Sequence, residues 1–227
     1  MTPLDWLILE IIYSIAIAVI CLATYIKTQR IYSLSKHSGI FHFRNIFLYF
    51  AISYIFRFLF IFVVFSHGPM RGPMFRFLLS YQDLTFLLVG YFSTLAVFSV
   101  VMTIMSRKID ISRHNLSSFM HIAAIILSVF SLATRSADIL VLLQTAILIG
   151  SVMLMSSKKA ITKGHVSKQN RIIITSLLVF WIINLLASSR FIQFEAKASI
   201  YIISALIFLS IYLKVKKRLI SNDKKKK

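Results

Sequence analysis

Seven blocks of apolar residues, separated by short basic loops, constrain this chain more than any other feature. They run over residues 4–26, 46–66, 78–105, 119–133, 139–156, 172–189 and 198–213. A helix needs about 20 apolar residues to cross a hydrocarbon core roughly 30 Å thick, and the blocks come near that length. A soluble domain is only about 45–50% apolar and about 25% charged, whereas this chain is 58% hydrophobic and 15% charged. The pattern therefore predicts seven membrane-crossing segments.

The segments are predicted to be helices, because an open sheet leaves edge hydrogen bonds unmet in lipid. The blocks also lack the alternation of polar and apolar residues that marks a membrane barrel. The fold class is thus all-α, a polytopic transmembrane bundle of seven helices. We expect the bundle to occupy residues 1–213 and a basic cytoplasmic tail to occupy 214–227. The first block lacks a basic leading segment and carries Asp5 and Glu10, so we expect it to be a helix of the bundle, not a cleaved signal peptide.

The placement of Lys and Arg predicts the orientation of this bundle. Of the 26 basic residues, four lie in the loop after the first helix, three after the third, five after the fifth and eight in the tail, which puts twenty on one side. Five lie on the other side, and Arg57 lies within the second block. Cytoplasmic loops carry the excess of Lys and Arg, so the N-terminus is predicted outside and the C-terminus in the cytoplasm. The same placement accounts for the net charge of +19 without nucleic acid.

Acidic residues show the reverse distribution. Five of the seven lie at or near the predicted outer helix ends: Asp5, Glu10, Asp83, Asp138 and Glu195. Helices that begin outside present their positive dipole ends there, which favours acids. The alternative interpretation is a charged vestibule for a ligand or an ion.

Arg57 is the most unusual residue, because it interrupts "SYIFRFLFIF" near mid-span. An unpaired arginine at a helix centre costs about 2.5–3.5 kcal/mol on insertion scales. Glu10 and Asp83 lie at similar predicted depths in the first and third helices. We therefore predict an intramembrane charge cluster in which Arg57 pairs with Glu10 or Asp83, with Tyr54 and Gln82 as further hydrogen-bonding groups. The alternative is an arginine that reaches headgroups or water alone.

Few motifs point to catalysis or to a cofactor. The single cysteine, Cys21, excludes an internal disulfide and a thiolate metal site. We find no acid/base pair, nucleophile motif or metal-ligand set, so the sequence assigns no catalytic, cofactor-binding or metal-binding residue and does not favour an enzyme. Lys197 lies at the outer entrance of the last helix, too shallow for a retinal linkage. Trp181, mid-span in the sixth helix, is expected to pack in the core.

Three smaller features concern helix packing. Gly90 is predicted to let a neighbouring helix approach closely, as is the pair formed by Ala146 and Gly150. The first helix is predicted to extend beyond the membrane through residues 36–37 and to stop at Gly39. This extension would lie on headgroups or meet a partner.

The segment "IYSLSKHSGIFHFRNIFLYFAISYIFRF", residues 31–58, resembles uncharacterised seven-helix membrane proteins of archaea. In those proteins an IY-x-L-x-KH-x-GI pattern leads into FRN and a helix that contains an arginine. The resemblance implies a prokaryotic plasma membrane and no particular activity.

Two functions fit these observations. The first is a sensory or regulatory seven-helix module with an outward-facing charged cavity and a basic face for a cytoplasmic protein partner. The second is a transporter of small molecules or ions, with two three-helix repeats around a short fourth helix. In both, the tail residues Lys214, Lys216, Lys217 and Arg218 are predicted to contact anionic headgroups.

Overall fold

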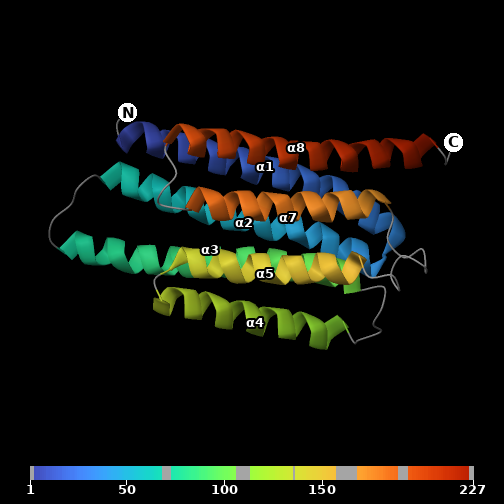
Figure 1. Cartoon of the computed structure of the whole chain (residues 1–227), viewed down its shortest axis with the longest axis horizontal. Coiled ribbons are helices and arrows are strands. Elements are labelled where there is room, and N and C mark those ends of the chain that lie inside the picture. The colour runs from blue at the N-terminus through green and yellow to red at the C-terminus, as the bar shows by residue number, and fades with distance from the viewer. Residues whose placement is uncertain are drawn as a thin grey trace.

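The computed structural model of the chain describes residues 3–67, 73–105, 113–134, 136–156, 168–188 and 194–224. Within these ranges it is all-α, with seven helices (Figure 1). They are α1 (Pro3–Ser35), α2 (Ser38–His67), α3 (Pro73–Met105), α4 (Arg113–Thr134), α5 (Ala137–Ser156), α7 (Lys168–Ser188) and α8 (Phe194–Lys224). The predicted all-α class and the seven helices are confirmed for the described residues.

Five of the helices are long and apolar enough to cross a membrane. Their candidate segments are Leu7–Ser35, Ser38–Val63, Tyr81–Met105, Ser117–Thr134 and Glu195–Lys217. The apolar parts described in α5 and α7 are shorter, Asp138–Met153 and Ile172–Asn184. The fourth helix, expected to be short, is 22 residues long.

Six helices form a closed ring in the order α1, α2, α3, α5, α7, α8, and α8 packs on α1. The remaining helix, α4, packs outside the ring against α3 and α5. Figure 1 shows successive helices running in alternating directions, so that α1, α3, α5 and α8 all start at the end that holds the N-terminus. We call this the acidic end, because Asp5, Asp138 and Glu195 lie in the first turns of three of these helices.

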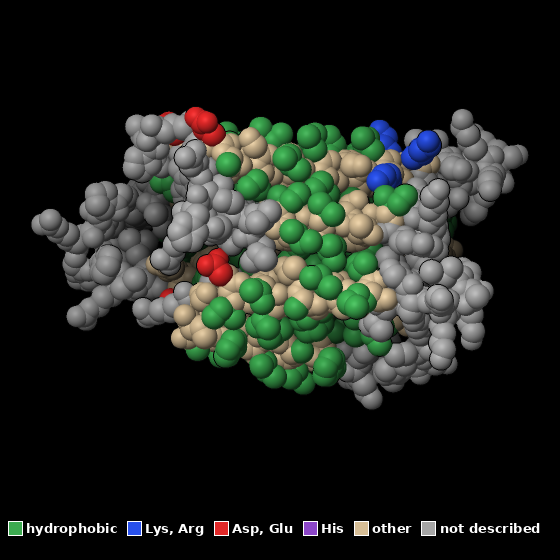
Figure 2. All heavy atoms as spheres, viewed as in Figure 1, with side chains coloured by type: hydrophobic (Ala, Val, Ile, Leu, Met, Phe, Trp, Pro, Cys, Tyr) green, Lys and Arg blue, Asp and Glu red, His purple; other side chains and the backbone are tan. Residues whose placement is uncertain are grey.

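The surface of the bundle differs from that of a soluble protein. Large apolar side chains are exposed around the bundle, among them Ile12, Ile126 and Ile202, each about three-fifths exposed. Figure 2 shows an apolar band between the two ends, with Asp and Glu toward one end and Lys and Arg toward the other. Soluble monomers rarely expose apolar patches larger than a few hundred Å².

Some polar side chains are buried among the apolar core, and several of their hydroxyls bond to their own helices. Thr24 donates to the carbonyl of Ile20 at 2.7 Å, and Thr94 donates to the carbonyl of Gly90 at 2.7 Å. Such bonds to the preceding turn satisfy a polar side chain without a second helix.

The first connection differs from its prediction. α1 ends at Ser35, and Lys36 takes the left-handed conformation (φ 49°) that terminates a helix. Gly39, the predicted stop, lies in the first turn of α2, where its N–H donates to His37 Nδ1 at 3.0 Å. The physical reason is that a side-chain acceptor at His37 allows α2 to begin at once, so the chain turns earlier than the glycine suggests.

The extension of α1 packs partly on α2. The Arg44 guanidinium of α2 lies over the rings of Tyr32, at 4.9 Å, and Tyr25, at 5.4 Å, both in α1. It also donates a hydrogen bond to Gln29. These cation–π contacts fix one face of the extension against the bundle.

Gly90 confirms the predicted close approach of helices. A Cβ at this position would lie 3.2 Å from Leu140 Cδ2 of α5 and 3.4 Å from Ser128 Oγ of α4. The corresponding prediction for Ala146 and Gly150 is wrong, since Ala146 is exposed and no described neighbour lies within 4 Å of a Cβ at Gly150. A small residue marks a helix contact only when its face points at another helix.

We expect Gly90→Val to lower the free energy of unfolding by about 1–3 kcal/mol, the usual effect of forcing extra carbons into a packed site. The matched variant Gly150→Val adds the same side chain where a Cβ meets nothing within 4 Å. It should change stability little. Thermal unfolding of the purified protein in detergent measures both, and equal losses would contradict the packing at Gly90.

Candidate functional site

A cavity of about 590 Å³ lies inside the six-helix ring. All six ring helices contribute to its wall, and no described side chain of α4 does. It reaches the surface beside Gln82, which is exposed. Its volume is in the range of small-molecule sites, about 300–1,000 Å³.

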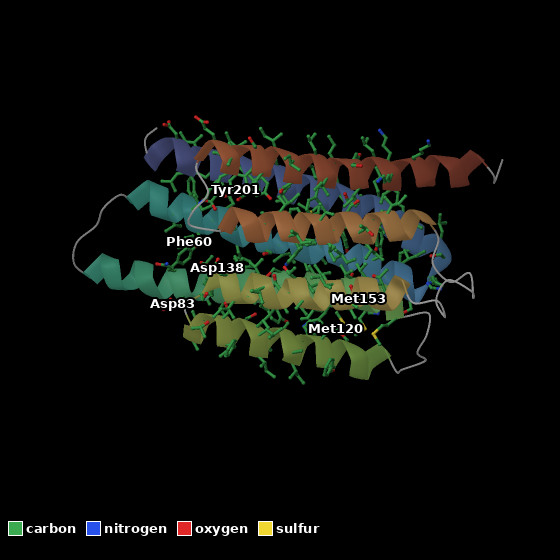
Figure 3. The ribbon with its side chains drawn as sticks, in the orientation of Figure 1. Phe60, Asp83, Met120, Asp138, Met153 and Tyr201 are labelled. Carbon is green, nitrogen blue, oxygen red and sulfur yellow. The ribbon has the colours of Figure 1, made fainter. Side chains whose placement is uncertain are left out.

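The cavity occupies mainly the half of the bundle nearer the acidic end. On α3 its lining runs from Gln82 to Ser93, which at 1.5 Å per residue is a depth of about 16 Å. Below it, Phe50, Phe180, Trp181 and Phe208 form a buried aromatic cluster with ring centroids 4.6–5.9 Å apart. Figure 3 shows two lining residues, Phe60 and Tyr201, toward the same end as Asp83 and Asp138. The exposed lining residue, Gln82, therefore lies toward the acidic end, and packed rings lie below the cavity. We call the cavity one-sided for this reason.

Arg57 and Glu10 meet in the wall of this cavity. Arg57 Nε donates to Glu10 Oε1 at 3.1 Å, and Arg57 Nη2 donates to the same oxygen. The Glu10 side chain is 8% exposed and that of Arg57 30% exposed. Both bonds end on one oxygen, so the contact lacks the two-oxygen fork of an ideal arginine–carboxylate pair.

The pairing follows from the register of α1 against α2. Glu10 and Tyr13 lie on one stripe of α1, and Tyr54 and Arg57 lie on one stripe of α2. One turn below the ion pair, the hydroxyls of Tyr13 and Tyr54 are 3.3 Å apart. Tyr201 of α8 stacks on Tyr13 at 4.2 Å and accepts a 3.5 Å contact from Arg57 Nη2. Three helices thus hold the guanidinium in place.

The other residues predicted for this cluster are placed differently. Tyr54 is buried next to Arg57, whose guanidinium lies 5.9 Å from its ring. Gln82 lines the same cavity at its mouth. Asp83 is exposed and does not line the cavity. Of the two candidate acids, the structure therefore brings Glu10 to Arg57.

The floor of the cavity holds a polar residue that the sequence analysis did not single out, Gln144. It is 1% exposed. Its Nε2 donates to Ser93 Oγ and Thr94 Oγ1, both at 2.9 Å, and its Oε1 accepts a 3.0 Å bond from Trp181 Nε1. One amide thus joins α3, α5 and α7. The sequence does contain a signal for this residue, because Gln144 is a lone glutamine within an apolar block. A buried amide must find hydrogen-bond partners, here on neighbouring helices.

The predicted lipid-contacting residues lie toward the C-terminal end of α8, and the first of them, Lys214, still lies against residues of α1, α2 and α7. α8 continues past residue 213 as an unbroken helix to Lys224, and Figure 1 shows it extending past α7. Lys216 and Lys217 are exposed, and Lys214 is half-buried beside Val215, which is buried. Arg218 lies in the same helix, outside the side chains that the structure describes. Among the described residues, no group of three or more His, Cys, Asp or Glu could hold a metal ion.

Comparisons with known proteins give a distant relative and no activity. The chain is 23% identical over 222 residues to an uncharacterised protein of Archaeoglobus fulgidus, across 96% of this chain and 95% of that one. No protein-family model matches the chain, and no solved structure matches it. The similarity to an archaeal protein therefore extends well beyond residues 31–58, to nearly the whole length.

Proposed function

We propose that this chain is a multi-pass protein of the plasma membrane that acts as a sensory or regulatory module, binding a small molecule in its cavity from the outer side. The observation that carries the proposal is the one-sided cavity of about 590 Å³, enclosed by six helices and containing an ion pair. The apolar band around the bundle supports the membrane location, because exposed isoleucines there would face lipid. The excess of Lys and Arg at the opposite end supports a cytoplasmic C-terminus.

In this proposal a ligand acts by changing how the ring helices pack. The cavity wall includes parts of α7 and α8, and both helices reach the end of the bundle opposite the acidic end, which we call the basic end. A ligand that binds one packing of these helices better than another shifts the population toward it. The basic face would present that change to a separate cytoplasmic protein.

The helix order supports transport as a second candidate. Around the ring, α1–α2–α3 is followed by α5–α7–α8, with α4 outside. The two sets run in matching directions (Figure 1). This order is expected of two parallel three-helix repeats joined by a linker helix. The aromatic closure below the cavity favours the sensory module, because a carrier must also open toward the second side.

Filling the cavity tests the proposal. Val89 lines the cavity, so Val89→Trp should fill part of it, while the matched variant Ile126→Trp places the same side chain on the exposed face of α4. Small molecules that raise the melting temperature of the parent in detergent should also raise that of Ile126→Trp and not that of Val89→Trp. A compound that stabilises all three alike does not bind in the cavity. Uptake of a stabilising compound into proteoliposomes would favour the carrier.

The basic end of α8 is proposed to contact anionic lipid. A peptide of residues 214–227 should sediment with phosphatidylserine vesicles at low salt and be released as salt rises, since each basic residue near such a surface adds about 1 kcal/mol. Equal sedimentation with neutral phosphatidylcholine vesicles would refute the electrostatic contact.

A further inference from the structure

The charged groups in the cavity wall are unbalanced. Among the residues that the structure describes, its lining contains two cations, Arg57 and Lys197, and one acid, Glu10. Glu10 forms a salt bridge with Arg57. Lys197 is half-buried, and the structure pairs it with no acid among the residues it describes. The described lining therefore carries one positive charge more than negative.

Arg57 has donors left over. Glu10 occupies its Nε and Nη2, and Tyr201 lies 3.5 Å from Nη2. Nη1 has no hydrogen-bond acceptor among the described residues, and the side chain is 30% exposed in a wall that faces the cavity. A guanidinium has five N–H donors in a fixed fork. Two of them are thus free for an anionic group inside the cavity.

Lys197 lies within reach of the same place. It precedes Tyr201 by four residues on α8, about 6 Å along the helix and on the same face. Because Tyr201 contacts Arg57, the Lys197 stem starts one turn nearer the mouth. Its flexible chain can bring the ammonium toward a group held by Arg57 Nη1.

The deeper wall is aromatic and apolar. Phe50, seven residues below Arg57 on α2, is about 10 Å deeper, and Phe180 and Trp181, whose rings pack against Phe50, line the same region. The Gln144 amide on the floor already has partners for both of its groups. This part of the cavity therefore suits a flat apolar body without strong polar groups.

We propose that the ligand is a small monoanionic amphiphile, an organic carboxylate held at the mouth by Arg57 Nη1 and Lys197, with an aromatic or aliphatic body about 10 Å long against Trp181. This inference rests on the proposed binding function and names its ligand class. The Glu10 contact makes Arg57 a fixed donor, so the carboxylate meets a preorganised site.

Three probes that share one body test the charge. They are 4-phenylbutyrate, 4-phenylbutylamine and 4-phenylbutanol, added to the full chain in phosphatidylcholine nanodiscs. Trp181 reports binding by its fluorescence in a Trp6→Phe background, because the chain has two tryptophans. The carboxylate should bind roughly ten-fold or more tightly than the amine, as expected for charge-assisted hydrogen bonds.

Variants test which residues bind the carboxylate of the ligand. Lys197→Met should weaken phenylbutyrate binding by roughly three- to ten-fold, and the matched variant Lys214→Met, on the same helix outside the cavity, should not change it. Glu10→Gln combined with Arg57→Gln removes both members of the pair without leaving a lone charge, and should reduce the selectivity for the acid to what Lys197 alone provides.

The outcomes separate the two proposals. If the alcohol or the amine binds as tightly as the acid, the anion assignment is wrong and the binding cavity stands. If Lys197→Met and Lys214→Met behave alike, Lys197 does not hold the headgroup and the proposed mouth is wrong. If none of the probes changes Trp181 fluorescence, the ligand class is overturned. In that case the melting-temperature comparison of Val89→Trp with Ile126→Trp still decides whether the cavity binds anything.

Discussion

Arg57→Glu is expected to lower the free energy of unfolding by about 3–5 kcal/mol, the usual cost of breaking a buried ion pair. The substitution puts a second carboxylate beside Glu10, whose side chain is only 8% exposed. Two like charges in a poorly solvated wall repel each other, and Glu10 has lost the guanidinium that donates to it. The variant should unfold at a lower temperature in detergent or fail to accumulate in the membrane.

Reversing the pair should restore part of the loss. Arg57→Glu combined with Glu10→Arg places opposite charges back at the same contact between α1 and α2. Arg57→Glu combined with Asp83→Arg is the matched control, because Asp83 is exposed and outside the cavity wall. Equal rescue by the two combinations would contradict the structure. So would an Arg57→Leu variant that is more stable than the parent while Glu10 is intact.

The number of helices could be predicted from the apolar blocks, and their ends could not. The blocks report how much chain lies in hydrocarbon, whereas helical hydrogen bonding continues into polar residues. The predicted extension of the first helix past residue 26 is observed, although α1 ends at Ser35 and not at Gly39; the second block begins at 46, yet α2 starts at Ser38. At the other end of the chain, α8 passes residue 213 without a break because nothing in the basic sequence terminates a helix.

The two candidate acids show why the depth of a residue in the membrane was insufficient to predict the partner of Arg57. Glu10 and Asp83 had similar predicted depths, but a residue's direction around its helix decides which neighbour it meets. The lining residues of α3 are Gln82, Thr85, Phe86, Val89, Gly90 and Ser93. These follow the three-and-four spacing of one helix face, and Asp83 lies about 100° away from Gln82 on the helix. That spacing was visible in the sequence, but which face points inward depends on the packing of all the helices.

Gln144 and Trp181 illustrate a second limit. The sequence shows one amide and one indole in apolar blocks, each with several conceivable partners. Only the ring order, which brings α5 between α3 and α7, joins Trp181 to Gln144 and Gln144 to Ser93. Long-range pairing of this kind is a property of the assembled bundle, so a single segment does not reveal it.

Cysteine labelling of intact cells is expected to give an all-or-none pattern that fixes the orientation. In a Cys21→Ser background, single cysteines replacing Ser66, Ser136 or Gln193 should react with an impermeant thiol reagent, because the proposal puts these positions outside. Cysteines replacing Ser112, Thr162 or Ser221 should react only after lysis. The reason is the distribution of charge. Twenty of the 26 basic residues are assigned by the sequence to the side of Ser112, Thr162 and Ser221, and an excess of Lys and Arg marks the cytoplasmic side.

Ser136 and Thr162 make the sharpest pair, because they precede and follow α5 (Ala137–Ser156). The described apolar part of α5, Asp138–Met153, is short for a crossing, as is that of α7, Ile172–Asn184. If α5 crosses, Ser136 and Thr162 label on opposite sides. If both label in sealed cells, α5 does not span the bilayer and the seven-crossing topology is wrong. If Thr162 labels and Ser136 does not, the bundle is inverted, the cavity opens to the cytoplasm, and its ligand must come from inside the cell.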